Sequence, residues 1–274
     1  MRALWKGAVS FGLVNIPVRL YAATERKSVK FSYLHAECST PIRYMKWCPA
    51  CEREVAAPEI VRGYEYEKGR YVVLRDEDFE RIPLKTTRTI DIVDFVNLGE
   101  IDPVYYDKTY FLEPADGGVK PYFLLHRVME NTGKIAIAKV IIRSRESLAA
   151  VRTYRDGTLV METMFYPDEI RSAKELVGTR EEVSLDPREI EMAENLVQNL
   201  SARFDPAKYT DKYREALLRV IHEKIKGAEV EEVAPVAETG KVVDLMEALR
   251  ASLEVTRAER QREKALEGVS LNRP

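Results

Sequence analysis

The chain has 274 residues, 45% of them hydrophobic, and its 13 glycines and 13 prolines are an ordinary share for a globular protein. Forty-three basic and 45 acidic residues give a net charge of −2 and an isoelectric point of about 6.1. These values exclude fibrous and low-complexity classes, no apolar run is long enough to span a membrane, and the charge alone does not indicate a nucleic-acid partner.

The amino terminus predicts a strand rather than a secretion signal. A basic start precedes an apolar stretch over residues 7–18, but polar residues and a proline interrupt it. Apolar side chains alternate with small or polar ones from Val9 to Leu13, and the alternation resumes at Ile16 after a shift of one residue. This pattern predicts one strand with a bulge near Val14. Without a signal peptide or membrane span, we expect a cytoplasmic protein.

The next segment carries a metal-binding pattern. His35 and Cys38 form one chelating pair, and Cys48 and Cys51 form a second pair after nine intervening residues. A two-residue gap lets both ligands of a pair turn toward one ion, and four protein ligands make a closed, structural zinc site. We therefore expect Zn²⁺ as a structural cofactor.

Two alternatives to zinc remain open at the sequence level. The run Trp47-Cys48-Pro49-Ala50-Cys51 is similar to the thioredoxin active site. That redox motif needs a helix that opens at the first cysteine within a βαβ unit, and no such unit surrounds it here. Three unrelated buried thiols are the other alternative.

Short strands with few helices are expected up to about residue 165. A helix is predicted over Pro121–Asn131, with Gly133 placed to end it. Asp156-Gly157 predicts a hairpin turn. Many strands joined by short turns favour a barrel or sandwich. The predicted strands are Arg70–Leu74, Thr87–Asn97, Val104–Leu112, Ile135–Arg145, Ala149–Tyr154 and Thr158–Tyr166.

Helices are expected from about residue 186 onward. Asp186 and Glu189 form a capping box at the start of an amphipathic helix. A second helix is predicted over Thr210–Lys226, followed by an acidic linker. A last helix has an apolar stripe only in its first half, and this stripe consists of Val242, Leu245, Leu249 and Leu253.

Catalytic constellations are not found in the sequence. His126 and His222 lie on predicted helices, where a structural role is expected. Asp91 and Asp94 are expected on opposite faces of one strand, so they cannot share a metal without a bulge. No Walker-type glycine loop and no nucleophile-elbow serine is present. We therefore predict no catalytic residue and a chain that is not an enzyme.

Basic residues gather in two parts of the chain. Between residues 139 and 155 five cations accompany the single acid Glu146. In one extended strand, Lys139, Arg143 and Arg145 would share a face. Such a face suits either solvent or DNA phosphates, and the scarcity of Asn and Gln nearby favours backbone contact over base reading. The predicted DNA-binding residues are Lys6, Arg19, Lys30, Arg43, Lys46, Lys139, Arg143, Arg145, Arg152 and Arg155.

Three stretches resemble bacterial Ku proteins and together cover most of the chain. They are "ALWKGAVSFGLVNIPVRLYAAT" from Ala3, "PVYYDKTYFLEPADGGVKPYFLLHRVMENTGKIAIAKVIIRSRESLAAVRTYRDG" from Pro103 and, more loosely, "VVDLMEALRASLE" from Val242. The resemblance implies a mainly β fold with a Ku-type β-barrel core, α+β overall. It divides the chain into a core (1–185) with an inserted zinc-ribbon-like bridge (31–56), a helical arm (186–227), a linker (228–240) and a partner-docking helix (241–274).

The same resemblance implies a role in non-homologous end joining. A ring-shaped homodimer would bind double-stranded DNA ends without sequence preference and recruit ligase D, in the nucleoid-associated part of the cytoplasm. No membrane and no small-molecule substrate are implied. The lysine-rich tail of some relatives is missing, since residues 241–274 are nearly balanced in charge. A zinc-ribbon regulator that reads sequence and a metal-dependent nuclease are the alternative functions.

Overall fold

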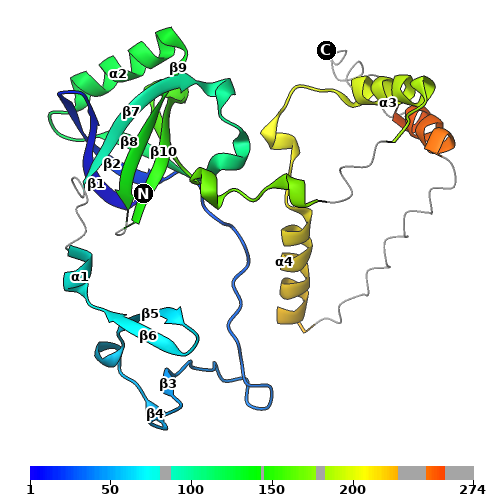
Figure 1. Ribbon diagram of the computed structural model, residues 1–274. Coiled ribbons are helices and arrows are strands. Elements are labelled where there is room, and N and C mark those ends of the chain that lie inside the picture. Colours follow the sequence, from blue (N-terminus) through cyan, green and yellow to red (C-terminus); the bar gives the residue numbers. More distant parts are fainter. Residues whose placement is uncertain (81–87, 143–144, 177–182, 228–244, 257–274) are drawn as a thin grey trace. The chain divides into compact units, whose positions relative to one another are not determined.

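The computed structural model of the chain describes residues 1–80, 88–142, 145–176, 183–227 and 245–256 (Figure 1). The chain divides into two compact units, Met1–Ser172 and Ala173–Pro274. Every strand found in the described residues belongs to the first unit, and the helices α3 and α4 belong to the second. None of the helices in the described ranges is both long and apolar enough to cross a membrane.

Seven strands of the first unit close into a barrel in the order β1-β2-β8-β11-β10-β9-β7. Neighbours are antiparallel except β1 and β7, which are parallel. Closure leaves no unpaired strand edge, and the predicted β-barrel core is confirmed. The strands are β1 Trp5–Phe11, β2 Val14–Ala22, β7 Thr89–Asn97, β8 Tyr106–Pro114, β9 Lys134–Ile142, β10 Arg145–Thr153 and β11 Leu159–Met164.

The first two strands form a hairpin, so the prediction of one bulged strand near Val14 was wrong. Phe11 lies opposite Val14, and two residues turn the chain between them. Gly12 has a φ of 58°, in the left-handed region that glycine adopts without a steric penalty. The turn of two residues explains why the apolar alternation shifts by one position.

A second hairpin replaces the single strand predicted over Ile135–Arg145. β9 ends at Ile142 and β10 begins opposite it at Arg145. Arg145 therefore lies on the side of the sheet that carries the buried Val140, whereas Lys139 lies on the other side. The predicted shared face of the cations was wrong. Arg143, the third of them, lies outside the described residues.

A register shift in β7 corrects the expectation that Asp91 and Asp94 point to opposite faces. The shift lies between Ile92 and Asp94, so Asp91 is opposite Lys139 and Asp94 is opposite Ile137. Lys139 and Ile137 share one face of β9, and both carboxylates therefore project on that face. Within the described part of the chain they belong to no group of three or more possible metal ligands.

Helix α2, Val119–Thr132, lies across one end of the barrel (Figure 1). Its buried residues Tyr122, Leu125 and Met129 join the core made by the inward side chains of the strands. The Tyr122 hydroxyl donates to the carbonyl of Leu112 at 2.7 Å and accepts from the Leu159 N–H at 2.6 Å. Loss of this hydroxyl would leave both groups unsatisfied, at a cost of about 1–3 kcal/mol. These bonds fix the helix to β8 and β11.

Two predicted chain reversals around this core are confirmed. Gly133 ends α2 with a φ of 65°. The β10–β11 hairpin turns at Arg155–Gly157, where Asp156 and Gly157 have φ values of 56° and 73°. Asp and Gly are residues that tolerate this left-handed geometry, so their order in the sequence was a reliable turn signal.

Residues 23–88 form an excursion between β2 and β7. It contains two small antiparallel hairpins and the predicted strand Arg70–Leu74 is confirmed as one member. Its elements are β3 Trp47–Cys48, β4 Arg53–Glu54, β5 Arg62–Glu67, β6 Arg70–Leu74 and α1 Asp76–Glu80. A two-stranded hairpin is marginal alone, so the excursion needs a further source of stability.

The second unit contains the predicted helices. Helix α3, Pro187–Leu200, starts at the predicted capping box, in which Asp186 accepts from the N–H of Arg188 at 2.8 Å and donates its own N–H to Glu189. Helix α4, Lys212–Ile225, is followed by Gly227 with a φ of 74°. Residues 245–256 are also helical. The predicted linker lies outside the described residues.

Candidate nucleic-acid interface

The pairing of β1 with β2 brings two predicted DNA-binding cations together. Lys6 lies directly opposite Arg19 on the outward face of the barrel. The Arg19 guanidinium is 3.4 Å from the carboxylate of Glu113, its neighbour on β8. Lys6 is exposed and has no ion-pair partner among the residues that the structure describes. Lys6 is therefore the more available of the two charges.

Glu113 is held in its ionised form by its neighbours. The Tyr21 hydroxyl donates to it at 2.6 Å, and this bond, with a smaller contribution from Arg19, keeps the pKa of the Glu113 carboxyl below its usual range. The same bond raises the pKa of Tyr21. At neutral pH the carboxylate therefore offsets much of the positive charge of Arg19.

Arg152 is part of the barrel wall rather than a free cation. Its guanidinium donates to both oxygens of Glu162, at 3.1 and 2.7 Å, and Glu162 is only 9% exposed. The bond to Glu162 raises the pKa of Arg152. A bidentate pair of this kind is specific in geometry, and removal of one partner leaves the other charge buried. The Arg152 charge is thus already matched within the fold.

Two predicted DNA-binding cations of the β9–β10 hairpin, Lys139 and Arg145, are also paired. Lys139 lies 3.7 Å from Glu146, and Arg145 forms an ion pair with Glu169. The N–H of Tyr166 and, to a smaller extent, Arg145 lower the pKa of Glu169. These pairs are exposed, so each contributes little to stability and can exchange for a phosphate partner.

Five predicted DNA-binding cations are exposed and have no ion-pair partner within the described ranges of the chain. Three belong to the excursion, one to β1 and one to the β10–β11 turn, and they are Lys30, Arg43, Lys46, Lys6 and Arg155. Unpaired exposed cations are the groups best suited to contact phosphates, because no ion pair must be broken first.

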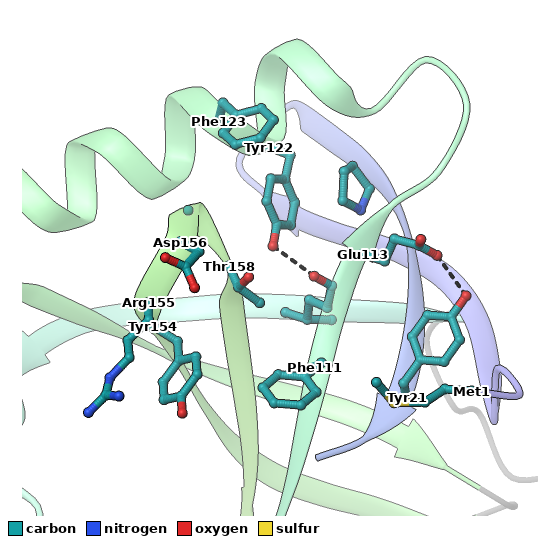
Figure 2. Close-up of a pocket in the computed structure, with 13 residues that line it drawn as sticks. Met1, Tyr21, Phe111, Glu113, Tyr122, Phe123, Tyr154, Arg155, Asp156 and Thr158 are labelled. Carbon is teal, nitrogen blue, oxygen red and sulfur yellow. Dashed lines mark hydrogen bonds between the residues drawn. The ribbon is translucent and has the colours of Figure 1, made fainter.

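The outward face beside Arg19 holds a cleft that the sequence did not predict. Strand pairing places Tyr21 opposite Phe111 and Phe111 opposite Val160. Their side chains therefore project from the same face of the sheet formed by β2, β8 and β11. Figure 2 shows the cleft on this face, next to α2 and the Arg155–Gly157 turn, and its volume is about 550 Å³. The aromatic Phe111, next to the buried Leu112 and therefore on the outward face of β8, was the signal that could have indicated it.

The first predicted pair of zinc ligands lies in one tight turn. The Nδ1 atom of His35 is 3.2 Å from the Sγ atom of Cys38. The backbone closes this turn twice, through Ser39 N–H to the His35 carbonyl at 2.8 Å and His35 N–H to the Thr40 carbonyl at 2.9 Å. Ser39 adopts a positive φ of 52° to complete it. Both ligands of the pair can therefore turn toward one ion.

The second pair occupies the β3–β4 hairpin. Cys48 ends β3 opposite Arg53, and Cys51 lies in the turn between the strands. The Cys51 N–H bonds the Cys48 sulfur and is the main cause of the lowered pKa of that thiol. No helix opens at Cys48, so the geometry of a thioredoxin-type dithiol is not present at this position.

The donor set of these two turns suits zinc. Three thiols and one imidazole are a standard tetrahedral set, and the three cysteines are free of disulfides. Among the residues described, no three of the ligands come together at one point. Each turn contains two of the four predicted ligands, and Cys38 and Cys51 are exposed.

The predicted partner-binding stripe falls on the helical residues 245–256. Leu253 is 9% exposed, whereas Leu245 is 50% exposed and Leu249 is half-buried. Val242 lies outside the described residues. One end of the stripe thus packs within the chain and the other end is open to solvent.

Residues 10–192 match the family described as "Ku70/Ku80 beta-barrel domain". A "Non-homologous end joining protein Ku" of Symbiobacterium thermophilum is 56% identical over 260 residues, which is 95% of this chain and 64% of that protein. A protein of the same name from Desulfitobacterium hafniense is 48% identical over 97% of this chain and 92% of its own length. The protein of this name from Bacillus subtilis is 46% identical over 94% of this chain and 83% of its own length. This chain thus spans just under two thirds of the Symbiobacterium relative.

Proposed function

Because this chain belongs to the Ku family of non-homologous end joining proteins, we propose that it repairs DNA double-strand breaks by binding duplex ends without sequence preference. The observation that carries the proposal is the family match over residues 10–192, which includes most of the closed seven-stranded barrel. As a member of this family the chain is a DNA end-joining protein and not an enzyme, as predicted.

A homodimer is the second part of the proposal, and the helical arm supports it. No residue of α3 or α4 is buried, although both helices carry apolar residues such as Val197, Leu200 and Leu218. An amphipathic helix is stabilised when its apolar face is covered. We propose that a second copy of the chain covers these faces and that the two copies close a ring around the DNA.

The test of this function compares a linear duplex with the same duplex closed into a relaxed circle. A ring is entered from an end, so we expect a footprint at each end of the linear form and none on the circle. Moving an internal sequence to a new position should leave the footprint where it was. Equal protection of the circle would contradict end binding, and protection that follows one sequence would instead support a zinc-ribbon regulator.

Substitution of Lys6 by alanine is expected to weaken binding to every duplex alike. Each phosphate contact contributes about −0.9 to the slope of log affinity against log salt, so the slope should become shallower by about that amount. Arg127→Ala is the matched control, since Arg127 is exposed but paired with Glu130 at 3.0 Å. An unchanged slope in the Lys6 variant would show that Lys6 contacts no phosphate.

Zinc is proposed as a structural ion of the excursion, held by His35, Cys38, Cys48 and Cys51. Support comes from the donor set and from the two preformed turns, each of which holds one pair of ligands. A bound ion would supply the stability that the small hairpins of this segment lack. We propose that residues 31–56 form a zinc-ribbon-like bridge inserted in the barrel domain.

Removal of residues 241–274 is expected to abolish stimulation of ligase D while end binding and dimer formation remain. A tethered amphipathic helix commonly docks in a partner's groove. Leu245→Ala, at the exposed end of the stripe, should lower stimulation, and Glu247→Ala on the same helix should not. Ligation of a linear plasmid by ligase D measures the effect. If the truncated protein unfolds instead, the helix is part of the chain's own core.

A further inference from the structure

Exposed aromatic rings and positive charge occur together in the first part of the excursion. Residues 25–47 include four aromatic side chains, each more than half exposed, and these are Phe31, Tyr33, Tyr44 and Trp47. The same range includes five cations and two acids. Proteins bind single-stranded nucleic acids with this combination, because aromatic rings stack on unpaired bases and cations contact the phosphates between them.

Backbone pairing places two aromatic and basic runs next to each other. The Ile42 N–H donates to the Tyr33 carbonyl at 3.0 Å, beside an isolated antiparallel bridge. The turn that holds the first pair of predicted zinc ligands closes this pairing at one end. Residues 30–33 and 42–47 therefore both extend from the other end, where they start side by side. One extended ligand can contact both runs.

The positive charge of this segment is not neutralised within it. Lys27 lies 3.5 Å from Glu25, so these two charges offset each other. Glu37 is then the one remaining acid of residues 25–47, against four further cations. Three of these cations are exposed and have no ion-pair partner in the described parts of the chain, and they are Lys30, Arg43 and Lys46. The segment therefore attracts an anionic ligand.

Negative charge beyond this segment affects one of its four rings most. Glu52 and Glu54 belong to the β3–β4 hairpin, and Glu54 lies directly opposite Trp47. A zinc ion held by three thiolates and a neutral imidazole adds about one more negative charge at the ligand turns. Trp47 is thus the least favourable of the rings for an anion. The positive balance of the segment remains, and its best-placed rings are Tyr33 and Tyr44.

The β5–β6 hairpin shows that exposed rings alone do not indicate such a surface. Tyr64 on β5 is 64% exposed, yet residues 62–80 include four cations and six acids. Arg70 lies over the ring of Tyr66, 5.5 Å from its centroid, and is paired with Glu67. An anionic strand is therefore expected on the earlier segment and not on this hairpin, which provides a matched control.

We propose that residues 30–47 bind the single-stranded extension of a broken DNA end through stacking of its unpaired bases. Every base has a flat face, so this contact is independent of sequence. Bases within a duplex are stacked on one another already, so the surface distinguishes an extension from a blunt end. The inference rests on the proposed end-joining function for the source of the strand. The bases stack on Phe31, Tyr33 and Tyr44, and the phosphates lie beside Lys30, Arg43 and Lys46.

The first test uses the full, zinc-loaded chain and a fluorescent oligothymidine of about twelve nucleotides, a length within the range that single-strand sites cover. The comparison probe is a strand of equal length made of abasic sites, which keeps the phosphates and lacks the bases. We expect the thymidine strand to bind about tenfold more tightly or better, measured by anisotropy. Equal binding of the two strands would overturn the proposal, because phosphate contacts alone would then explain it.

Substitutions in the segment separate stacking from charge. Tyr44→Ala should weaken binding of the thymidine strand about tenfold, and Tyr44→Phe should retain it because the ring remains. Tyr64→Ala is the matched control, since Tyr64 is also well exposed but lies among acids. Arg43→Ala should make the slope of log affinity against log salt shallower by about 0.7, the value for one phosphate of a single strand. Equal binding by the Tyr44→Ala and Tyr64→Ala variants would overturn the proposal.

Three further outcomes assign these rings to another role and also overturn the proposal. Loss of zinc or of folded structure in Tyr44→Ala, measured by elemental analysis and thermal unfolding, would make the ring part of the segment's own core. Conversion of a dimer to a monomer in this variant, measured by sedimentation, would make it a contact between copies of the chain. Displacement of the thymidine strand by polyglutamate at equal charge would indicate an acidic protein as the partner.

The last comparison keeps this inference distinct from end binding. A blunt duplex and the same duplex with a thymidine extension are bound in parallel. Wild-type protein should prefer the extended duplex, and Tyr44→Ala should lose this preference while it binds the blunt duplex as well as Tyr64→Ala does. Equal affinity of wild-type protein for the two duplexes would overturn the inference. Failure to bind the blunt duplex at all would instead contradict the proposed end binding.

Discussion

Protein loaded on a linear duplex is expected to stay there through a high-salt wash once both ends have been blocked. Salt weakens contacts with phosphates by about 10³–10⁵ in affinity between 50 and 200 mM when 6–10 phosphates are involved. A complex held by such contacts alone therefore dissociates. A closed ring that surrounds the duplex is retained by topology, and salt does not open it.

The controls isolate topology from affinity. The same loaded duplex with one end left open should lose its protein in the wash, because a ring can slide off. A duplex whose ends are blocked before the protein is added should never load. Protein retained on beads through the wash measures each case. Equal loss from the doubly blocked and the open duplex would mean that no ring is closed.

Cys48→Ser is expected to remove zinc and to disorder the segment around residues 35–51. A structural zinc contributes on the order of 10–16 kcal/mol to the folding of its own small module. The barrel should remain folded, because its core consists of strand residues such as Val9 and Ile90 together with α2. Elemental analysis measures the metal, and hydrogen exchange measures both parts of the chain.

A second variant separates loss of a ligand from general damage at the same position. Cys48→His replaces one zinc donor by another and should retain much of the metal that the serine variant loses. Exchange in the barrel strands should be the same in both variants. Freshly purified, reduced wild-type protein without zinc would contradict the prediction directly.

Much of the fold could be predicted because turn and capping signals in short stretches of sequence match the structure formed there. The Asp-Gly turn, the glycine after α2 and the capping box at Asp186 each need only a few neighbouring residues, and all three are confirmed. Two hairpins were missed for one reason. The β1–β2 turn at Gly12 and the end of β9 at Ile142 both lie within an apolar alternation, and periodicity alone does not show where one strand ends and the next begins.

The candidate site could be predicted only in part, since pairing across strands decides which charges are free. Nothing in the sequence distinguishes Arg152 from Arg155 as a candidate DNA contact. In the structure Arg152 forms an ion pair with Glu162, ten residues later, whereas Arg155 is exposed and has no ion-pair partner among the described residues. The aromatic cleft depends on the register of β8 with β2 and β11, which are far apart in the sequence. The four proposed zinc ligands remain a prediction, and sequence reasoning could propose them because the spacing within each pair is local.

The parallel seam between β1 and β7, where Val9 lies opposite Ile90, has a consequence for biosynthesis. At about 5–20 residues per second the ribosome needs roughly 4 to 16 s to reach Ile90 after Val9. Through this interval the β1–β2 hairpin has two unpaired edges, which can add strands from other nascent chains. Slower translation of the excursion, through rare codons, should therefore lower the yield of monodisperse protein even though its sequence is unchanged.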